Sequence, residues 1–315
     1  MNWVRSLSPN MLGGLCAVLS VLCFAINDTT IKFLSDGYAL HQVVLIRSAL
    51  GLVFVLALIA PLTVGRRIWR TQKLRLHILR GMCVVMANMT FFAGLAALKL
   101  ADAVAVFFIA PLMITVFSVF FLKEYVGPWR WAAVIVGFLG VLLVAKPGSE
   151  AFQVASLLPI LAAVFYALIH ILTRKMGGTE SAATMAFYIQ VMFIIVCLLI
   201  GLLIGDGRFG DQDDPSLRFL LRAWSWPAQA DYPFFLILGI GVAFGGYFIS
   251  QAYRVAEAGF VAPFEYLGMP IAIVFGILLF DEYPDVRTLL GAALIIGAGL
   301  FTLWREQRVA ARVNT

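Results

Sequence analysis

Charged residues are scarce in this chain, and their scarcity excludes an ordinary soluble domain. Only 13% of the residues are Asp, Glu, Lys or Arg, whereas 62% are hydrophobic, and the mean hydropathy is +0.97. A soluble domain carries about 25% charged residues. The net charge of +6 does not indicate nucleic-acid binding, because the basic residues fall in short segments between apolar runs, where they set membrane orientation. The composition therefore predicts a polytopic membrane protein.

Histidine and cysteine are also rare, which argues against catalytic and metal sites. The chain has three His and four Cys, and Cys16, Cys23, Cys83 and Cys197 all fall inside apolar runs. Such cysteines are expected to be free packing residues rather than disulfide partners or ligands. The sequence has no Ser/His, paired-Asp or HExxH arrangement of the kind that an intramembrane hydrolase needs. We therefore expect no enzyme activity, no catalytic residue, no metal and no cofactor.

Apolar runs long enough to cross a bilayer, which takes about 20 residues, recur along the whole chain. Lys and Arg concentrate in alternate connections, which favours both termini in the cytoplasm. The longest connection, 206–231, is then external, either as a loop with an interfacial helix or as a lid. We predict an all-α membrane protein with ten transmembrane helices. They cover residues 11–33, 38–60, 74–97, 102–122, 129–146, 153–175, 182–204, 232–254, 257–280 and 285–305.

Two stretches in different halves of the chain resemble each other. Residues 105–124 and 257–282 each carry a proline in the first half, a long aliphatic run and a terminal acid. The similarity predicts that 1–147 and 148–315 are two copies of a five-helix unit. Because five is odd, the second copy enters the membrane in the opposite sense. We therefore predict two inverted repeats around a central cavity, an arrangement typical of alternating-access carriers.

Several polar side chains fall at membrane depth, where they are costly and usually functional. Glu265 lies inside the ninth run and is the candidate cation-binding acid. Arg47, deep in the second run, needs a partner such as Asp28 or Glu265. It either clamps a substrate carboxylate or ties helices together. Asp28 is interpreted either as a proton or cation site or as a helix-end carboxylate paired with Lys32.

Two amides and a histidine complete the polar candidates. Asn88 and Gln190 lie mid-span, where they either orient a substrate or make interhelical hydrogen bonds. Gln190 falls near the repeat position of Arg47. His170 falls near that of Asp28, and is either a proton site or a structural residue. Because aromatic faces attract cations, ring contacts to a substrate are expected from Phe92, Phe108, Tyr166 and Tyr266.

The duplicated stretches resemble the signatures of EamA-type carriers of the drug/metabolite transporter superfamily, and the resemblance covers nearly the whole chain. Residues 110–124 resemble the first signature and 258–282 the second. The VAPFEY run at 261–266 is similar to the group of S-adenosylmethionine uptake carriers. The resemblance implies a basket of ten helices around a central cavity, in a bacterial inner membrane, with transport that uses no ATP.

Together these observations predict a secondary active transporter of a small amphiphilic metabolite. The substrate is expected to be cationic or zwitterionic, similar to S-adenosylmethionine or an amino acid. The alternatives are an exporter of amino acids or drug-like compounds, an importer of a vitamin or nucleoside-like compound, and, more remotely, a channel or an intramembrane enzyme. The expected partners are a small-molecule substrate, membrane lipid and, as one option, a second copy in a homodimer, with no nucleic acid.

Overall fold

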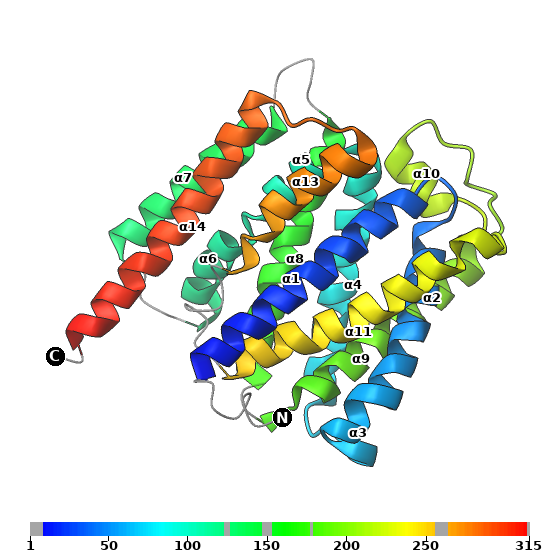
Figure 1. The fold of residues 1–315 in the computed structure, drawn as a ribbon, viewed down its shortest axis with the longest axis horizontal. Helices are drawn as coiled ribbons and strands as arrows, with labels where there is room; N and C mark the ends of the chain where they lie inside the picture. Colours follow the sequence, from blue (N-terminus) through cyan, green and yellow to red (C-terminus); the bar gives the residue numbers. More distant parts are fainter. Residues whose placement is uncertain (1–8, 123–126, 147–152, 177–178, 256–263, 314–315) are drawn as a thin grey trace.

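Figure 1 shows the computed structural model of the chain, which describes residues 9–122, 127–146, 153–176, 179–255 and 264–313. Helices and their connections make up all of these residues. Seven helices are long and apolar enough to cross a membrane, and three shorter apolar helices accompany them. The predicted all-helical class is therefore confirmed.

The first half of the chain runs from the long helix α1 to α7, which packs closely against α14 of the second half. The second helix, α2, continues through a π-helical turn, Val55–Ile59, into the short α3, Ala60–Leu62. The helices are α1 (Pro9–Leu34), α2 (Leu40–Phe54), α4 (Leu74–Ala97), α5 (Leu100–Phe107), α6 (Ala110–Leu122) and α7 (Pro128–Ala145).

The second half contains four long helices and two shorter ones. Ser181 caps α9 by accepting a hydrogen bond from the backbone N–H of Thr184 at 3.0 Å, and Asp214 caps α10 in the same way. The helices are α8 (Leu157–Met176), α9 (Ala182–Ile204), α10 (Pro215–Leu221), α11 (Tyr232–Val255), α13 (Gly268–Phe280) and α14 (Val286–Val313).

The predicted span over 102–122 is present as Leu100–Phe121, but it is not one continuous helix, because the structure breaks it into α5 and α6. Pro111 has no N–H to donate to the carbonyl of Phe107, the last residue of α5. A similar turn at Tyr266–Leu267 precedes α13, and there Pro270 cannot donate to the carbonyl of Tyr266. The first part of the predicted 257–280 helix, with Pro263, lies outside the described residues.

Glycine allows the closest helix contacts. α1 packs against α11, where the hydroxyl of Ser20 donates to the carbonyl of Gly245 at 3.0 Å. α7 pairs with α14 (Figure 1), and a Cβ on Gly140 would lie 2.7 Å from the carbonyl oxygen of Gly291. Small residues of this kind let helices approach in a membrane, where no hydrophobic effect drives them together.

The bundle has two ends, named here after the helices that lie there. The α3 end is the lower end in Figure 1, where α3 lies and where α1 begins. The α10 end is the upper end, where α10 lies and where α14 begins. At the α10 end, the connection 206–231 is held on the start of α2. The phenol of Tyr38 donates to Asp231 at 2.5 Å, and Gln42 bonds to the backbone of Ser225.

Candidate functional site

Arg47 lies in the middle of α2 and is almost completely buried, with 1% of the residue exposed. Its Nη2 donates to Oδ1 of Asn88 on α4 at 2.9 Å, and its Nη1 donates to Oδ1 of Asn27 on α1 at 3.5 Å. The guanidinium lies over the rings of Phe92 and Phe193, at 5.6 and 5.2 Å from their centroids. Helices α1, α2, α4 and α9 therefore all contact one buried cation, and these residues with Asp28 and Gln190 are called the Arg47 group.

No described carboxylate oxygen lies within 4.0 Å of the Arg47 guanidinium, and its buried Nε has no hydrogen-bond partner in the described part of the chain. Asp28 is linked to it through Asn27, whose Nδ2 donates to Oδ1 of Asp28 at 3.5 Å. Lys32 pairs with Glu282 instead, at 3.0 Å, so the interpretation of Asp28 as the partner of Lys32 is wrong.

Gln190 on α9 faces α2 one helical turn away from Arg47. A Cβ on Gly51 would lie 3.0 Å from Nε2 of Gln190, and 3% of Gln190 is exposed. Its Oε1 is buried without a hydrogen-bond partner among the described residues. Two predicted amides, Asn88 and Gln190, thus lie near the predicted arginine, and one of the two has an acceptor to spare.

Tyr166, His170 and Glu265 form a second polar group, called the Glu265 group. The hydroxyl of Tyr166 donates to Oε2 of Glu265 at 3.4 Å, and the rings of Tyr166 and His170 meet edge to face at 4.7 Å. Arg80 is buried beside α8, and its Nε donates to the hydroxyl of Thr173 at 2.8 Å. The predicted cation site and one predicted proton site therefore lie together, next to an arginine.

A row of aromatic rings joins the two groups. Phe92, which lies under Arg47, meets Phe91 at 5.4 Å between ring centroids, and Phe91 meets Phe107 at 5.2 Å. Phe107 then meets Tyr166 at 5.2 Å. The buried Arg47 and the partly buried Glu265 thus lie at the two ends of a row of aromatic rings, and an edge-to-face arrangement of such rings is favourable.

Among the described residues, the rings of Phe108 and Tyr266 contact each other and make no ring contact with the Arg47 group or the Glu265 group. They lie at the two helix breaks and pack edge to face against each other, at 5.5 Å. The hydroxyl of Tyr266 lies against Gly299 of α14, because a Cβ there would be 1.8 Å from it. Their predicted ring contacts with a substrate stay predictions.

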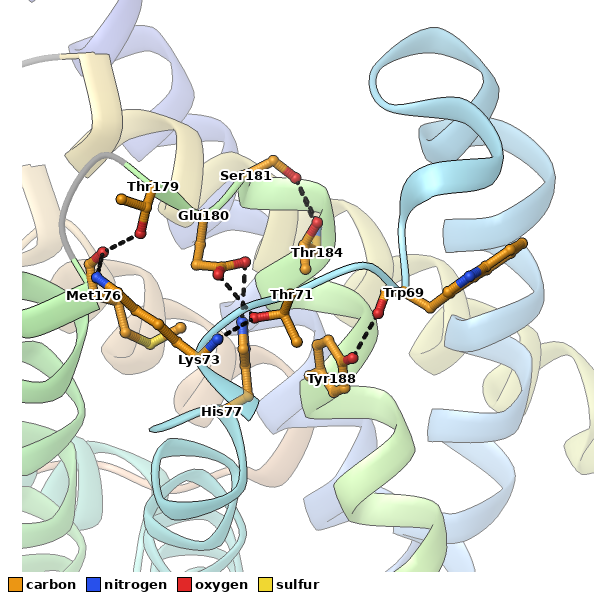
Figure 2. A network of polar contacts seen from close by, with 10 residues as sticks. All are labelled: Trp69, Thr71, Lys73, His77, Met176, Thr179, Glu180, Ser181, Thr184 and Tyr188. Atoms are coloured by element: carbon orange, nitrogen blue, oxygen red, sulfur yellow. Dashed lines mark hydrogen bonds and ion pairs between the residues drawn. The ribbon is translucent and has the colours of Figure 1, made fainter. Parts of the chain in front are cut away.

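A polar network closes the α3 end, and Figure 2 shows it. Glu180, with 6% of its side chain exposed, lies 3.2 Å from Nε2 of His77 and accepts a hydrogen bond from Thr71 at 2.8 Å. The ring of Tyr188 stacks on His77 at 4.4 Å, and its hydroxyl donates to the carbonyl of Trp69 at 2.7 Å. The connection before α4 is therefore tied to the connection between α8 and α9.

Different pairs tie the halves together at the α10 end. Glu282 accepts from Lys32 at 3.0 Å and from the backbone N–H of Leu100 at 2.8 Å. Two further contacts cross between the halves: Thr288 to Asp102 at 2.6 Å and Lys146 to Asp285 at 2.5 Å.

Phe193 and the His77–Glu180 pair were not among the site residues predicted from the sequence, and Asn27 had no predicted role of its own. Asn27 had a signal, because it precedes an acid at membrane depth, and Phe193 lies one turn beyond Gln190. Glu180 lies in the connection between α8 and α9. In a polar connection the sequence does not distinguish an acid that is buried from one that is exposed. Only the contacts of its neighbours distinguish them.

Broken helices with polar side chains beside them, in a bundle of apolar spans, are typical of a multi-pass membrane transporter. The chain belongs to the EamA-like transporter family, whose model matches residues 11–146 and again 153–304. It is therefore a transporter of the drug/metabolite transporter superfamily and not an enzyme, as the sequence predicted.

Relatives with assigned substrates cover nearly the whole chain. The S-adenosylmethionine uptake transporter of Rickettsia prowazekii is 27% identical over 94% of this chain and 94% of its own length. Riboflavin transporters of Vibrio cholerae and Rhizobium johnstonii are 30% and 28% identical over 94% and 96% of this chain, and in each case 94% of the relative is covered. A solved crystal structure with 17% identity has a TM-score of 0.65 over 94% of this chain and 98% of its own, which supports the fold alone.

Proposed function

We propose that this protein is a secondary active transporter that moves a small amphiphilic metabolite, cationic or zwitterionic, by alternating access. The observation that carries the proposal is the pair of polar groups inside the bundle, Arg47 with Asn88 and Glu265 with Tyr166, joined by a row of aromatic rings. A flat substrate with opposite charges at its two ends matches this arrangement. The family model supports transport but leaves the substrate open.

The proposed architecture is two inverted repeats, residues 1–147 and 148–315. The family model matches the chain twice, at 11–146 and 153–304, and both helix breaks come two to four residues before a proline. Broken helices at the interface of inverted repeats are typical of substrate sites. On the charge bias of the connections, we place the α3 end and both termini in the cytoplasm of a bacterial cell.

Each predicted site residue has a proposed role. Glu265 receives the cationic part of the substrate and Arg47 an anionic part, while Asn88 and Gln190 orient it. Phe92 and Tyr166 supply ring faces, and Phe108 with Tyr266 line the site when the broken helices move. Asp28 and His170 are the candidate proton sites.

S-adenosylmethionine and riboflavin represent two substrate classes to compare. The first has a sulfonium, a carboxylate and a flat base, so it offers a charge to each group. The second has a flat ring system without a carboxylate. Because both classes occur among relatives at similar identity, an importer of a vitamin-like compound stays the second candidate, and an amino-acid exporter the third.

Counterflow in sealed proteoliposomes tests the proposal. Vesicles loaded with S-adenosylmethionine, riboflavin or an amino-acid mixture are assayed for saturable uptake of the labelled compound. We expect Arg47→Gln and Glu265→Gln to lower uptake by about thirtyfold or more, since losing one partner of a buried charge contact costs about 2–5 kcal/mol. Asp36→Asn, which changes an exposed acid, is the matched control. Unsaturable flux, or normal uptake by both glutamine variants at normal protein levels, would refute the proposed site.

A further inference from the structure

Three polar side chains of the Arg47 group, Arg47, Asn27 and Asp28, are connected in a row by hydrogen bonds. Binding a substrate at Arg47 would not by itself need this connection. Asn27, with 2% of the residue exposed, accepts from Arg47 and donates to Asp28. Asn27 therefore transmits a change at the guanidinium to the carboxyl group, and the reverse. Both links measure 3.5 Å, so each is loose enough to shorten or break as the charges change.

The described contacts of the guanidinium leave one of its nitrogens for an anion. Its carbon lies near the rings of Phe92 and Phe193, and its two Nη atoms donate to Asn88 and Asn27. The N–H at Nε is buried and has no partner among the described residues. A planar carboxylate that lies in the guanidinium plane can accept from Nε and from one Nη at once, which is the strongest geometry available to arginine. A neutral group in the same place would leave the charge of the guanidinium unmatched.

We infer that the substrate's carboxylate and the Asp28 carboxylate compete for the charge of Arg47, so that a proton enters on Asp28 when the carboxylate binds. This rests on the proposed function and names both a substrate group and the coupling ion. In the empty carrier, Arg47 balances ionised Asp28 through Asn27. Once a substrate carboxylate occupies Nε, two anions would share one buried cation. A proton from water then binds Asp28, and the net charge of the group is the same before and after.

Few other charges act on Asp28. Arg47 is the charged group that faces it among the described residues of the helices packed around α1. Lys32, one helical turn further along α1, is held by Glu282 and the carbonyls of Leu95 and Leu98. The charge state of Asp28 is therefore set mainly by what occupies Arg47, because an ionised carboxylate at membrane depth is costly without a cation.

The first experiment needs no substrate. Infrared difference spectra of the full-length protein in nanodiscs, recorded through a pH titration, report the protonated carboxyl band, which Asp28→Asn assigns. We expect Arg47→Gln to raise the pH at which the Asp28 band appears, and Asn27→Leu to raise it by less. Asn27→Leu also keeps the test open if Arg47→Gln does not fold. Asp36→Asn, an exposed acid two turns further along the chain, should leave the Asp28 band unchanged.

The second experiment adds two probes that differ by one carboxylate, S-adenosylmethionine and its decarboxylated analogue. We expect the first to bind with uptake of a proton, measured with a pH dye in weak buffer, and to strengthen the Asp28 band. The analogue should bind at least about tenfold more weakly and take up no proton, since losing a charge-assisted contact costs about 1.5–3 kcal/mol. Asp28→Asn should bind the first probe without proton uptake.

Each outcome decides between the two proposals. Equal binding of both probes would overturn this inference and the role of Arg47 as the receiver of an anionic group, but would leave transport of a cationic metabolite standing. Proton uptake that persists in Asp28→Asn would also overturn it. If neither probe binds, the proposed substrate class fails, and the titration alone decides the link between Arg47 and Asp28. An Asp28 band that appears at the same pH in the wild type, Arg47→Gln and Asn27→Leu would refute that link.

Discussion

The α3 end and the α10 end both join the first half of the chain to the second, but with different chemistry. At the α3 end two side chains, His77 and Thr71, contact one nearly buried acid, Glu180, while Lys73 and Tyr188 bond separately to backbone carbonyls (Figure 2). At the α10 end they are distributed over separate acids, Glu282, Asp102 and Asp285, which bond to different helices.

The two arrangements differ in how far one substitution reaches. Removing the carboxylate that His77 and Thr71 share affects two contacts at once, whereas removing one of several separate carboxylates leaves the others in place. An alternating-access carrier must open each end in turn. We therefore expect the α3 end to depend more on one acid than the α10 end does.

The largest effect is expected for Glu180→Ala. It leaves His77, 2% exposed, and Thr71 facing an empty site, and loss of one partner of a buried pair costs about 3–5 kcal/mol. We expect the free energy of unfolding in mixed micelles to fall by about 3 kcal/mol. Asp211→Ala, which removes an exposed acid near α10, should change it by less than about 0.5 kcal/mol. Equal effects of the two variants would show that Glu180 is not the centre of the α3 end.

A smaller effect is expected for Glu282→Gln at the α10 end. The amide can still accept from the backbone N–H of Leu100 but loses the charge that pairs with Lys32, whose side chain is 10% exposed. We expect a loss of about 1 kcal/mol, since the pair is partly buried and its neighbours remain. Combining it with Thr288→Val, which frees Asp102, should add nearly the full effect of the second change. A combined loss well beyond the sum would contradict the distributed arrangement.

The same contrast explains what the sequence could predict of the fold. Uninterrupted apolar runs placed α4 and α9 at 74–97 and 182–204, the bounds that the structure has. The break between α5 and α6 was not predicted, because a proline in a membrane helix can be tolerated and its effect depends on the neighbouring helices. α14 runs to Val313, beyond the predicted 305, since charged residues can extend a helix past the apolar span.

The candidate site divides in the same way. Depth in an apolar run was enough to select Arg47, Asn88 and Glu265, because a polar group there needs a protein partner. The predicted partners of Arg47, Asp28 or Glu265, were wrong, because its direct contacts are Asn88 and Asn27, on two helices distant from α2 in the sequence. Glu180 was missed because the connections are polar throughout, and burial of one acid among many requires the packing of three segments around it.

The smallest effect is expected from lowering the pH, which acts at the α10 end on its most exposed ion pair, Lys146–Asp285. The hydrogen bond from Lys146 and the backbone N–H of Thr288 lower the pKa of Asp285 from 3.8 to about 2. A carboxyl group with a lowered pKa stabilises the fold fully above its unfolded value, and that stabilisation is lost as the pH falls toward the folded value. Between about pH 4 and pH 2, the wild type should therefore lose slightly more stability than Lys146→Met, in which the pair is absent. Because the Asp285 side chain is 47% exposed, added salt should reduce this difference in stability between the two proteins. Unfolding midpoints of both proteins at several pH values and two salt concentrations would measure it. A difference that salt leaves unchanged would mean that the α10 end closes on a buried contact after all, as the α3 end does.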